Sequence, residues 1–186
     1  GSTIAREVDH GGIYLHAGVE SSVASTKAYS SMVVALLMLG GVLSYRRGGT
    51  EEATRSLAQD LLRLPEEVRT TLKLQQNIDA LADKLSEHHD WFFLGRGNLY
   101  PVALEGALKI TEVAYIHAQA FPAGEMKHGP IALVEPNHLS VLLLPQDELL
   151  YNKSLSALEE IKARGGTVLT VSTRPAEKLS DYHIEV

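Results

Sequence analysis

The second half of the chain alternates short apolar runs with longer stretches of helical periodicity. Runs that are apolar throughout are typical of parallel strands buried on both faces. The expected strands are residues 91–94, 118–121, 140–144, 167–172 and 183–186. The expected helices between them are residues 100–117 and 149–164. This order predicts an α/β fold of three layers, in which helices cover both faces of a mainly parallel sheet.

The first half of the chain has mainly helical periodicity. A very short strand is predicted at residues 13–15, followed by a long apolar helix from about residue 26 to residue 45. Two arginines and two glycines at 46–49 end that helix, because cations and glycine favour a helix C-terminus. Further helices are expected at residues 50–64, from Pro65 onward, and at residues 75–87. The glycine pair predicts a domain boundary after residue 48.

The boundary divides the chain unequally. Residues 1–48 are interpreted as the C-terminal part of a first domain, since one short strand with a helix behind it cannot form a domain alone. Residues 49–186 form the second domain, with a helical lead-in at 49–88 and the sheet with its helices at 89–186. The last expected strand runs to the end of the chain, so this second domain is interpreted as truncated.

The composition predicts a cytoplasmic protein with no membrane partner. The strongly apolar run Met32–Leu43 has 12 residues, whereas a membrane-spanning helix needs about 20, so we expect it in a protein core. Residues 1–7 lack the charged and apolar regions of a signal peptide. The sequence contains no cysteine, which excludes a disulfide scaffold, a thiolate zinc site and a thiol nucleophile within these residues.

Charge and motif spacing narrow the classes of ligand. With a formal net charge of −6 and no basic block beyond Arg46-Arg47, the chain is not expected to bind nucleic acid. A small phosphate ester remains a candidate, because backbone N–H groups and hydroxyls can hold it locally. The eight histidines show no metal-ligand spacing. Tyr100 replaces the third glycine of the dinucleotide fingerprint, so we expect no cofactor.

The expected helix at 100–117 carries the candidate chemistry. Glu105, Lys109 and Glu112 fall within an arc of roughly 60°, because they are spaced at i, i+4 and i+7. Most of the remaining circumference is apolar or small, so the helix is expected to be buried nearly all round. Two interpretations stay open: a solvated ladder of ion pairs, or a polar cleft that these side chains face. His128, in a loop with glycine and proline, can titrate near neutral pH.

Four motifs resemble a known family. They are His16–Tyr29, Leu94–Gly97, Ala103–Lys109 and Gly124–Pro130. Together they resemble the isomerase half of the glutamine:fructose-6-phosphate aminotransferases, the glucosamine-6-phosphate synthase family. That half contains two sugar isomerase (SIS) domains. The resemblance implies that residues 1–48 end the first SIS domain and that residues 49–186 are most of the second.

The resemblance also implies roles for single residues. Glu112 matches the base that moves a proton between C1 and C2 of the sugar phosphate, and Glu105 and Lys109 match residues that complete the same helix face. His128 matches a histidine that assists ring opening from the neighbouring subunit, which implies a homodimer. Val23 and Ser25 match a turn that borders the sugar.

The resemblance has gaps. Val19 and Gln119 stand where the family pattern has Pro and Glu. The phosphate-binding loop of the first SIS domain, the lysine that forms a Schiff base with the ketose phosphate and the glutaminase domain that releases ammonia do not lie in this chain. The chain is therefore expected to be inactive alone and to work with the glutaminase domain of the same parent. The alternative is another SIS-domain phosphosugar isomerase or deglycase, or a domain that senses a sugar phosphate.

Overall fold

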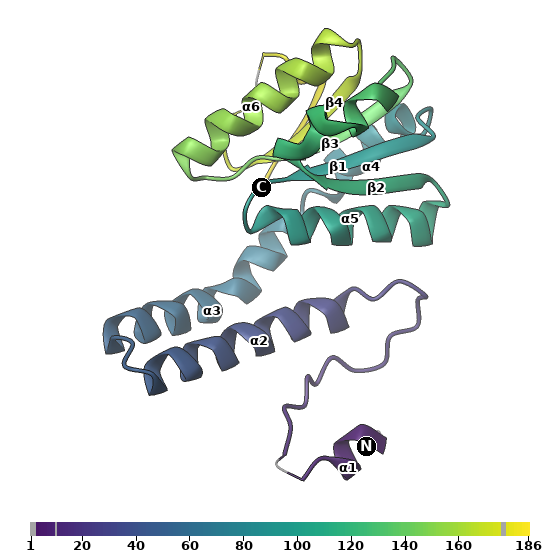
Figure 1. The fold of residues 1–186 in the computed structure, drawn as a ribbon. Coiled ribbons are helices and arrows are strands. Elements are labelled where there is room, and N and C mark those ends of the chain that lie inside the picture. Colours follow the sequence, from purple (N-terminus) through teal and green to yellow (C-terminus); the bar gives the residue numbers. More distant parts are fainter. Residues whose placement is uncertain (1–2, 10, 176–177) are drawn as a thin grey trace. The chain divides into compact units, whose positions relative to one another are not determined.

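The chain forms two compact units, which we describe separately. They comprise residues 1–70 and 71–186 in a computed structural model that describes residues 3–9, 11–175 and 178–186 (Figure 1). Residues 1 and 2, at the start of the segment that was expected to lack a signal peptide, lie outside the described residues.

The second unit contains a five-stranded, fully parallel sheet. The strands are β1 (Asp90–Gly95), β2 (His117–Pro122), β3 (His138–Leu143), β4 (Thr167–Ser172) and β5 (Tyr182–Glu185). Their order across the sheet is β2-β1-β3-β4-β5, and every neighbouring pair is parallel. The predicted fold class is therefore confirmed.

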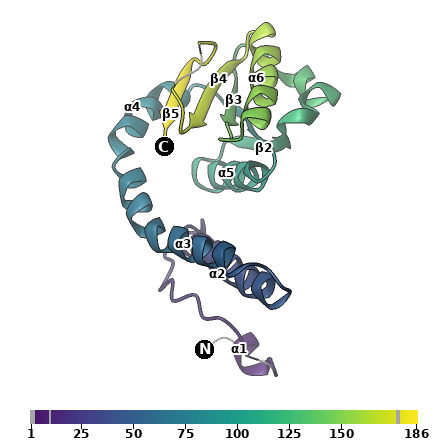
Figure 2. The same ribbon diagram turned by 90° about the vertical axis from the view of Figure 1, so that its left-hand side faces the viewer.

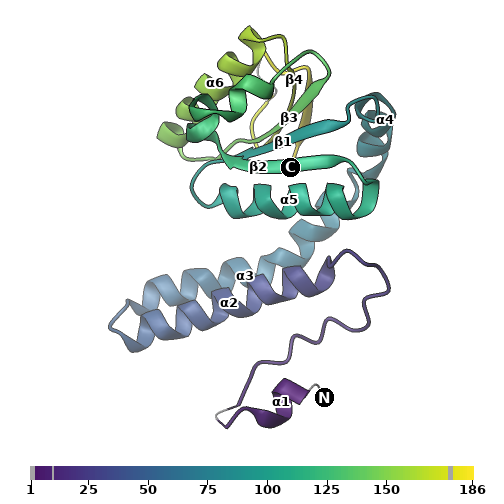
Figure 3. The same ribbon diagram turned by 45° about the vertical axis from the view of Figure 1, so that its right-hand side comes forward.

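Helices cover the two faces of this sheet, as Figures 2 and 3 show. One face carries α5 (Leu99–Ala114) and α4 (Gln75–Leu85), with a core in which Trp91, Phe93 and Leu139 are buried. The other face carries α6 (Glu148–Ala163) and the short 3-10 helices η1 (Ala123–His128) and η2 (Pro130–Leu133). The faces separate because successive side chains of a strand point to opposite sides, and here both sides are apolar.

The turn between β1 and α5 brings strand and helix into direct contact. Gly95 is buried at the end of β1, and a Cβ atom added there would lie 2.3 Å from the carbonyl oxygen of Leu99. Gly97 has a φ of 58°, which glycine adopts without steric cost. The backbone N–H of Leu99 donates to the carbonyl of Arg96, and that of Tyr100 donates to the carbonyl of Gly97. The two glycines therefore allow α5 to start directly beside the end of β1.

The first unit is largely helical. It contains α1 (Thr3–Glu7), α2 (Lys27–Arg46) and most of α3 (Glu51–Leu72), and α2 runs beside α3 in Figures 1 and 3. The predicted strand at 13–15 is wrong, because these residues are neither strand nor helix and no described strand of this unit pairs with them. The predicted restart at Pro65 is also wrong, since α3 continues through this proline although it has no N–H to donate.

Helix α2 differs from the expected core helix. None of its residues is buried within the described structure, and Leu36, Met38 and Val42 are more than half exposed. The physical reason is that α3 contacts one side of α2, near Gly41, and leaves much of its apolar surface uncovered. By length and composition alone α2 could cross a membrane, with a mean hydropathy of 1.6 over its most apolar window. One such helix is weak evidence, because core helices pass the same test.

Replacing Gly95 by alanine is expected to destabilise the second unit by about 1–3 kcal/mol, because the added methyl group meets backbone atoms that cannot rotate away. Urea unfolding followed by the fluorescence of Trp91 measures this change. The control is Leu108→Ala on α5, where the side chain is 47% exposed, and where a change of about 0.5 kcal/mol or less is expected. An equal loss in both variants would contradict the close contact at Gly95.

Candidate functional site

A strip of three charged side chains lies on α5. The ammonium of Lys109 donates to Oε2 of Glu112 over 2.6 Å, and its Nζ lies 3.4 Å from Oε1 of Glu105. The three side chains are 22–28% exposed, so they are partly buried. Helix α5 holds the strip in place by packing Ala103 and Ala107 against the sheet. The three side chains therefore lie together on one side of α5, as their spacing in the sequence predicted.

The two carboxylates keep Lys109 charged. The hydrogen bond with Glu112 raises the pKa of Lys109, partial burial opposes this, and Glu105 raises the pKa further. Lys109 is thus an ammonium at neutral pH. A carboxylate beside a fixed ammonium can accept a proton from a carbon acid when a ligand lies against it. The strip can therefore do proton-transfer chemistry, with Glu112 as the carboxylate closest to the cation.

The surroundings of the strip differ from the expectation. Helix α5 was predicted to be buried nearly all round, and this is wrong, because its described buried residues are Ala103 and Ala107. Leu104 and Leu108 on one side of the strip are 46% and 47% exposed, and Val113 on the other side is 64% exposed. One side of α5 packs on the sheet, and the opposite side presents the charges between two exposed apolar borders.

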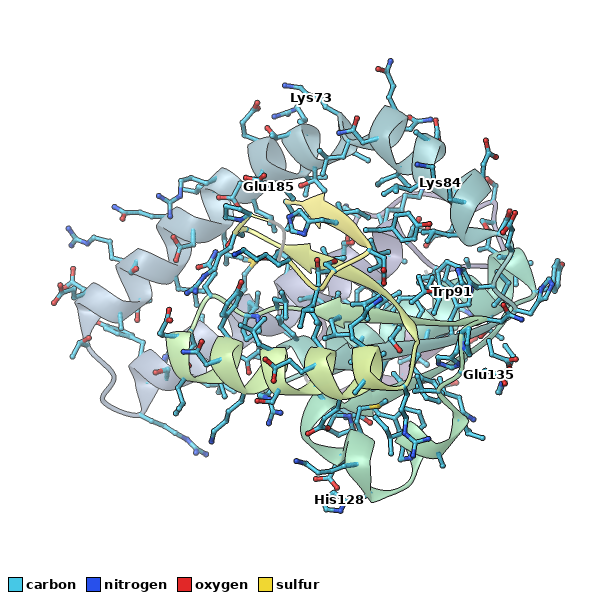
Figure 4. All side chains as sticks on the ribbon, turned by 90° about the horizontal axis from the view of Figure 1, so that it is seen from above. Lys73, Lys84, Trp91, His128, Glu135 and Glu185 are labelled. Carbon is cyan, nitrogen blue, oxygen red and sulfur yellow. The ribbon has the colours of Figure 1, made fainter. Side chains whose placement is uncertain are left out.

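His128 lies apart from the strip. It is the last residue of η1, which packs on the face of the sheet that α6 covers, whereas α5 covers the other face. Figure 4 shows His128 at the outer end of η1, pointing away from the sheet. The preceding Lys127 donates to Oε1 of Glu160 on α6 over 3.0 Å, which holds this segment to the helix. The structure thus does not bring His128 to Glu112 within one chain.

Val23 and Ser25 belong to the first unit. The side chain of Val23 is 91% exposed, whereas that of Ser25 is partly buried and its hydroxyl donates to Oε2 of Glu20 over 3.4 Å. Both residues lie in the turn that leads into α2.

Sequence reasoning missed Glu20. Its Oε1 accepts from the backbone N–H groups of Thr26 and Lys27 and from the Thr26 hydroxyl, and its Oε2 accepts from the N–H of Ala28. Hydrogen bonds from Thr26, Ala28 and Lys27 lower the pKa of Glu20 to about 2, although desolvation opposes them. The sequence held one indication of this role. Helix α2 has no acidic residue in its first turn, and a helix N-terminus attracts a negative charge, so an acidic residue shortly before the helix was a candidate cap.

Comparison with known protein families identifies the family of this chain. The family model described as "SIS domain" matches residues 84–186. The chain belongs to the SIS domain family.

Two relatives of this SIS protein carry the same name. The glutamine–fructose-6-phosphate aminotransferase (isomerizing) of Thermus thermophilus is 45% identical over 180 residues, which are 96% of this chain and 30% of that protein. The enzyme of the same name from Escherichia coli K12 is 40% identical over 186 residues, which are 100% of this chain and 30% of that protein. The resemblance seen in the motifs is therefore confirmed, and the chain spans about 30% of the length of these relatives.

A solved structure agrees with this result. The C-terminal domain of glucosamine-fructose-6-phosphate aminotransferase from Francisella tularensis is 39% identical and superposes with a TM-score of 0.85. The match covers 91% of this chain and 49% of that one.

A second group of polar side chains lies at the amino ends of the strands of the SIS sheet. A cavity of about 590 Å³ is bordered by His117, His138, Asp90 and Glu135, close to the starts of β1, β2 and β3. The ring of His138 is buried against Phe92, and burial lowers the pKa of this histidine. Within residues 3–9, 11–175 and 178–186 no three metal-binding side chains come close enough to share an ion. This region is separate from the strip on α5.

The low pKa of Glu20 predicts how the start of α2 responds to acid. Because the folded pKa, about 2, lies below the ordinary 4.5, the stabilisation from Glu20 is complete above pH 4.5 and is lost as the pH falls toward 2. The amide signals of Thr26, Lys27 and Ala28, followed by NMR from pH 6 downward, are expected to move with an apparent pKa well below 4.5. In Glu20→Gln they are expected not to titrate, and a wild-type midpoint near 4.5 would contradict the observed hydrogen bonds.

Proposed function

We propose that this chain is part of the isomerase half of a glutamine–fructose-6-phosphate aminotransferase, which makes glucosamine 6-phosphate from fructose 6-phosphate and the ammonia of glutamine. The observation that carries the proposal is the contact of 2.6 Å between Lys109 and Glu112 on α5. It lies in a chain that is 45% identical to an enzyme of that name. The absence of cysteine agrees with a cytoplasmic location.

Glu112 is the proposed base. Once ammonia has displaced the lysine, so that the ketose phosphate is an iminium at C2, the Glu112 carboxylate takes a proton from C1. The C–H electron pair forms the C1–C2 double bond, and the C=N electron pair moves to nitrogen. The proton is then delivered to C2 while the C1 hydroxyl loses its proton, so that a carbonyl forms at C1 and the amino group stays on C2. Since the iminium is the electron sink, a carboxylate of modest basicity suffices. Lys109 keeps this carboxylate in position, and Glu105 completes the network.

The remaining parts of the reaction are assigned to other segments of the parent enzyme. The chain spans about 30% of its relatives, so the glutaminase domain and the Schiff-base lysine are expected on the rest of the parent. We propose that residues 1–48 end its first SIS domain and that residues 49–186 belong to its second. We expect no turnover by this chain alone.

His128 is proposed to act across a subunit interface. Its place on the face of the sheet opposite α5 supports this, because one chain cannot present it to its own Glu112. An imidazole can donate and accept protons, which suits the opening of a sugar ring. The proposal therefore requires a homodimer in which His128 of each chain serves its partner, with Val23 and Ser25 bordering the sugar.

In the full-length enzyme, Glu112→Gln is expected to reduce aldose formation by about 10²–10⁴-fold, because it keeps the shape of the side chain and removes the proton acceptor. The removal of the C1 proton is measured directly by its exchange with solvent in fructose 6-phosphate, followed together with product formation. Hydrolysis of glutamine is expected to continue, since it does not use this carboxylate.

Glu105→Gln on the same strip is the matched control, with a smaller expected loss. Wild-type exchange in Glu112→Gln would place the base elsewhere. Loss of sugar binding in both folded variants would show that the strip is a structural network. Isomerisation that proceeds without any glutamine-dependent product would favour a phosphosugar isomerase instead.

The homodimer predicts complementation between two inactive variants. Full-length His128→Ala and Glu112→Gln are each expected to be nearly inactive, and mixed dimers are expected to regain activity, because one of the two sites then has both groups. Activity after subunit exchange, with sedimentation to verify the dimer, measures this. A monomeric full-length enzyme with full activity would contradict the shared site.

A further inference from the structure

Helix η1 carries His128 and has three distinct sides. A 3-10 helix has three residues per turn, so residues three positions apart lie on the same side. The resulting pairs are Ala123 with Met126, Gly124 with Lys127, and Glu125 with His128. The first pair is buried in the core or close to it, whereas both members of the last pair are exposed. The contacts of the first two pairs therefore fix how η1 is rotated about its axis and where His128 points.

Helix η1 depends on such contacts, because its own backbone holds it weakly. The hydrogen bonds of a 3-10 helix have poor geometry, and runs longer than three or four residues are uncommon. Helix η1 has six residues, and Pro122 before it makes no side-chain capping bond. Gly129 follows with a φ of 147°, so the chain turns away directly after His128. Neighbouring elements must therefore keep η1 in place.

Arg96, in the turn after β1, lies against η1. A Cβ atom added to Gly124 would be 3.0 Å from Nη1, 3.5 Å from Nη2 and 3.6 Å from Cζ of Arg96. Since both Nη atoms are nearer than Cζ, the outer edge of the guanidinium faces Gly124. Nη2 of Arg96 also donates to the carbonyl of Lys153 on α6 over 3.3 Å. The two-pronged end of this side chain thus connects α6 with the start of η1, and the glycine leaves room for it.

A second contact ties the same side of η1 to α6. Lys127 shares this side with Gly124, and its ammonium donates to Glu160 over 3.0 Å. Lys153 and Glu160 are seven residues apart and therefore lie on one side of α6, about two turns from each other. The side chain of Lys127 is 62% exposed, so this ion pair alone contributes little. Arg96 is therefore the stronger restraint on η1.

The position of Arg96 is costly for a side chain that only fills space. Its Nε is buried and has no hydrogen-bond partner among the residues that the structure describes. A buried donor without a partner lowers stability, and an apolar side chain of similar length would avoid that cost. The arrangement therefore favours a role for the guanidinium beyond packing.

Arg96 also belongs to the turn that starts α5. Its carbonyl accepts from the backbone N–H of Leu99, the first residue of α5. The backbone of this residue thus contacts the helix that carries Glu112, and its side chain contacts the segment that carries His128. One residue connects the two groups to which proton transfers are assigned.

We propose that Arg96 is a positioning residue for the opening of the sugar ring: it fixes the rotation of η1, so that His128 points outward to the site of the partner subunit (Figure 4). This inference rests on the role proposed for His128. Its structural part, that Arg96 holds η1, rests on the contacts alone. Arg96 acts through His128 and takes no part in the proton transfer by Glu112.

Kinetics of the full-length enzyme with two substrates test this role. Arg96→Met is expected to reduce kcat with fructose 6-phosphate by about 10–100-fold, because a misplacement of about 1 Å has such an effect. With 5-deoxyfructose 6-phosphate, which lacks the hydroxyl that closes the ring, it is expected to stay within about twofold of the wild type. His128→Ala is expected to show the same contrast, whereas Glu112→Gln loses activity with both substrates. Arg96→Lys keeps the charge without the fork and is expected to recover little.

A double variant and a matched control complete the kinetic test. Arg96→Met combined with His128→Ala is expected to be no slower than His128→Ala alone, because a residue that acts through His128 has no further effect once the imidazole is gone. The control is Arg174→Met. Arg174 also binds the start of α6, through the carbonyl of Gln146 and the carboxylate of Glu148. It is expected to stay within about twofold of the wild type with both substrates.

Amide hydrogen exchange in the 186-residue chain, measured by NMR, tests the structural part. The amides of Met126, Lys127 and His128 are expected to exchange at least about tenfold faster in Arg96→Met and at the wild-type rate in Arg174→Met. Unchanged exchange in Arg96→Met would overturn the inference, and so would wild-type activity or an equal loss with both substrates. If His128→Ala is fully active with fructose 6-phosphate while exchange in η1 responds to Arg96, the role proposed for His128 fails and Arg96 remains the residue that holds η1.

Discussion

The contact between the end of β1 and the start of α5 is the constraint on which the second unit depends. Gly95 leaves no side chain between the strand and the carbonyl of Leu99, so α5 begins at the carboxyl end of β1 and runs back along the sheet. Since α5 is fixed at this end, the direction in which its outer surface points is fixed as well. The position of the charged strip thus depends on a glycine that lies ten residues before Glu105, together with the packing of Ala103 and Ala107 against the sheet.

The strands could be predicted because burial on both faces leaves little choice of residue type. The predicted range 167–172 is the observed β4, and the run at 91–94 differs from β1 by one residue at each end. The spacing of Glu105, Lys109 and Glu112 predicted their common side of α5 for an equally local reason, since the helical period alone fixes it. These strands and the common side of the three charges, which depend on residues close together in the sequence, were predicted correctly, whereas the helix restart expected at Pro65 was not.

Properties that depend on residues far apart in the structure or the sequence were not predicted correctly. Residues 13–15 have the composition of a strand, but a strand requires a partner, and the described part of the first unit provides none. Burial of α2 and α5 was inferred from their apolar surfaces, but periodicity records which side is apolar and not whether anything covers it. Glu20 was missed because its partners lie five to eight residues away across a turn that no periodic pattern describes.

The charge balance of the strip restricts what can cover α5. Glu105 and Glu112 share the single ammonium of Lys109, so the three groups carry one unbalanced negative charge. The exposed borders at Leu104, Leu108 and Val113 favour contact with another apolar surface. Such a surface cannot close tightly over the centre, because a desolvated carboxylate without a partner is too costly. Any protein surface that seals the borders must therefore bring a positive group to the strip or enclose water over it.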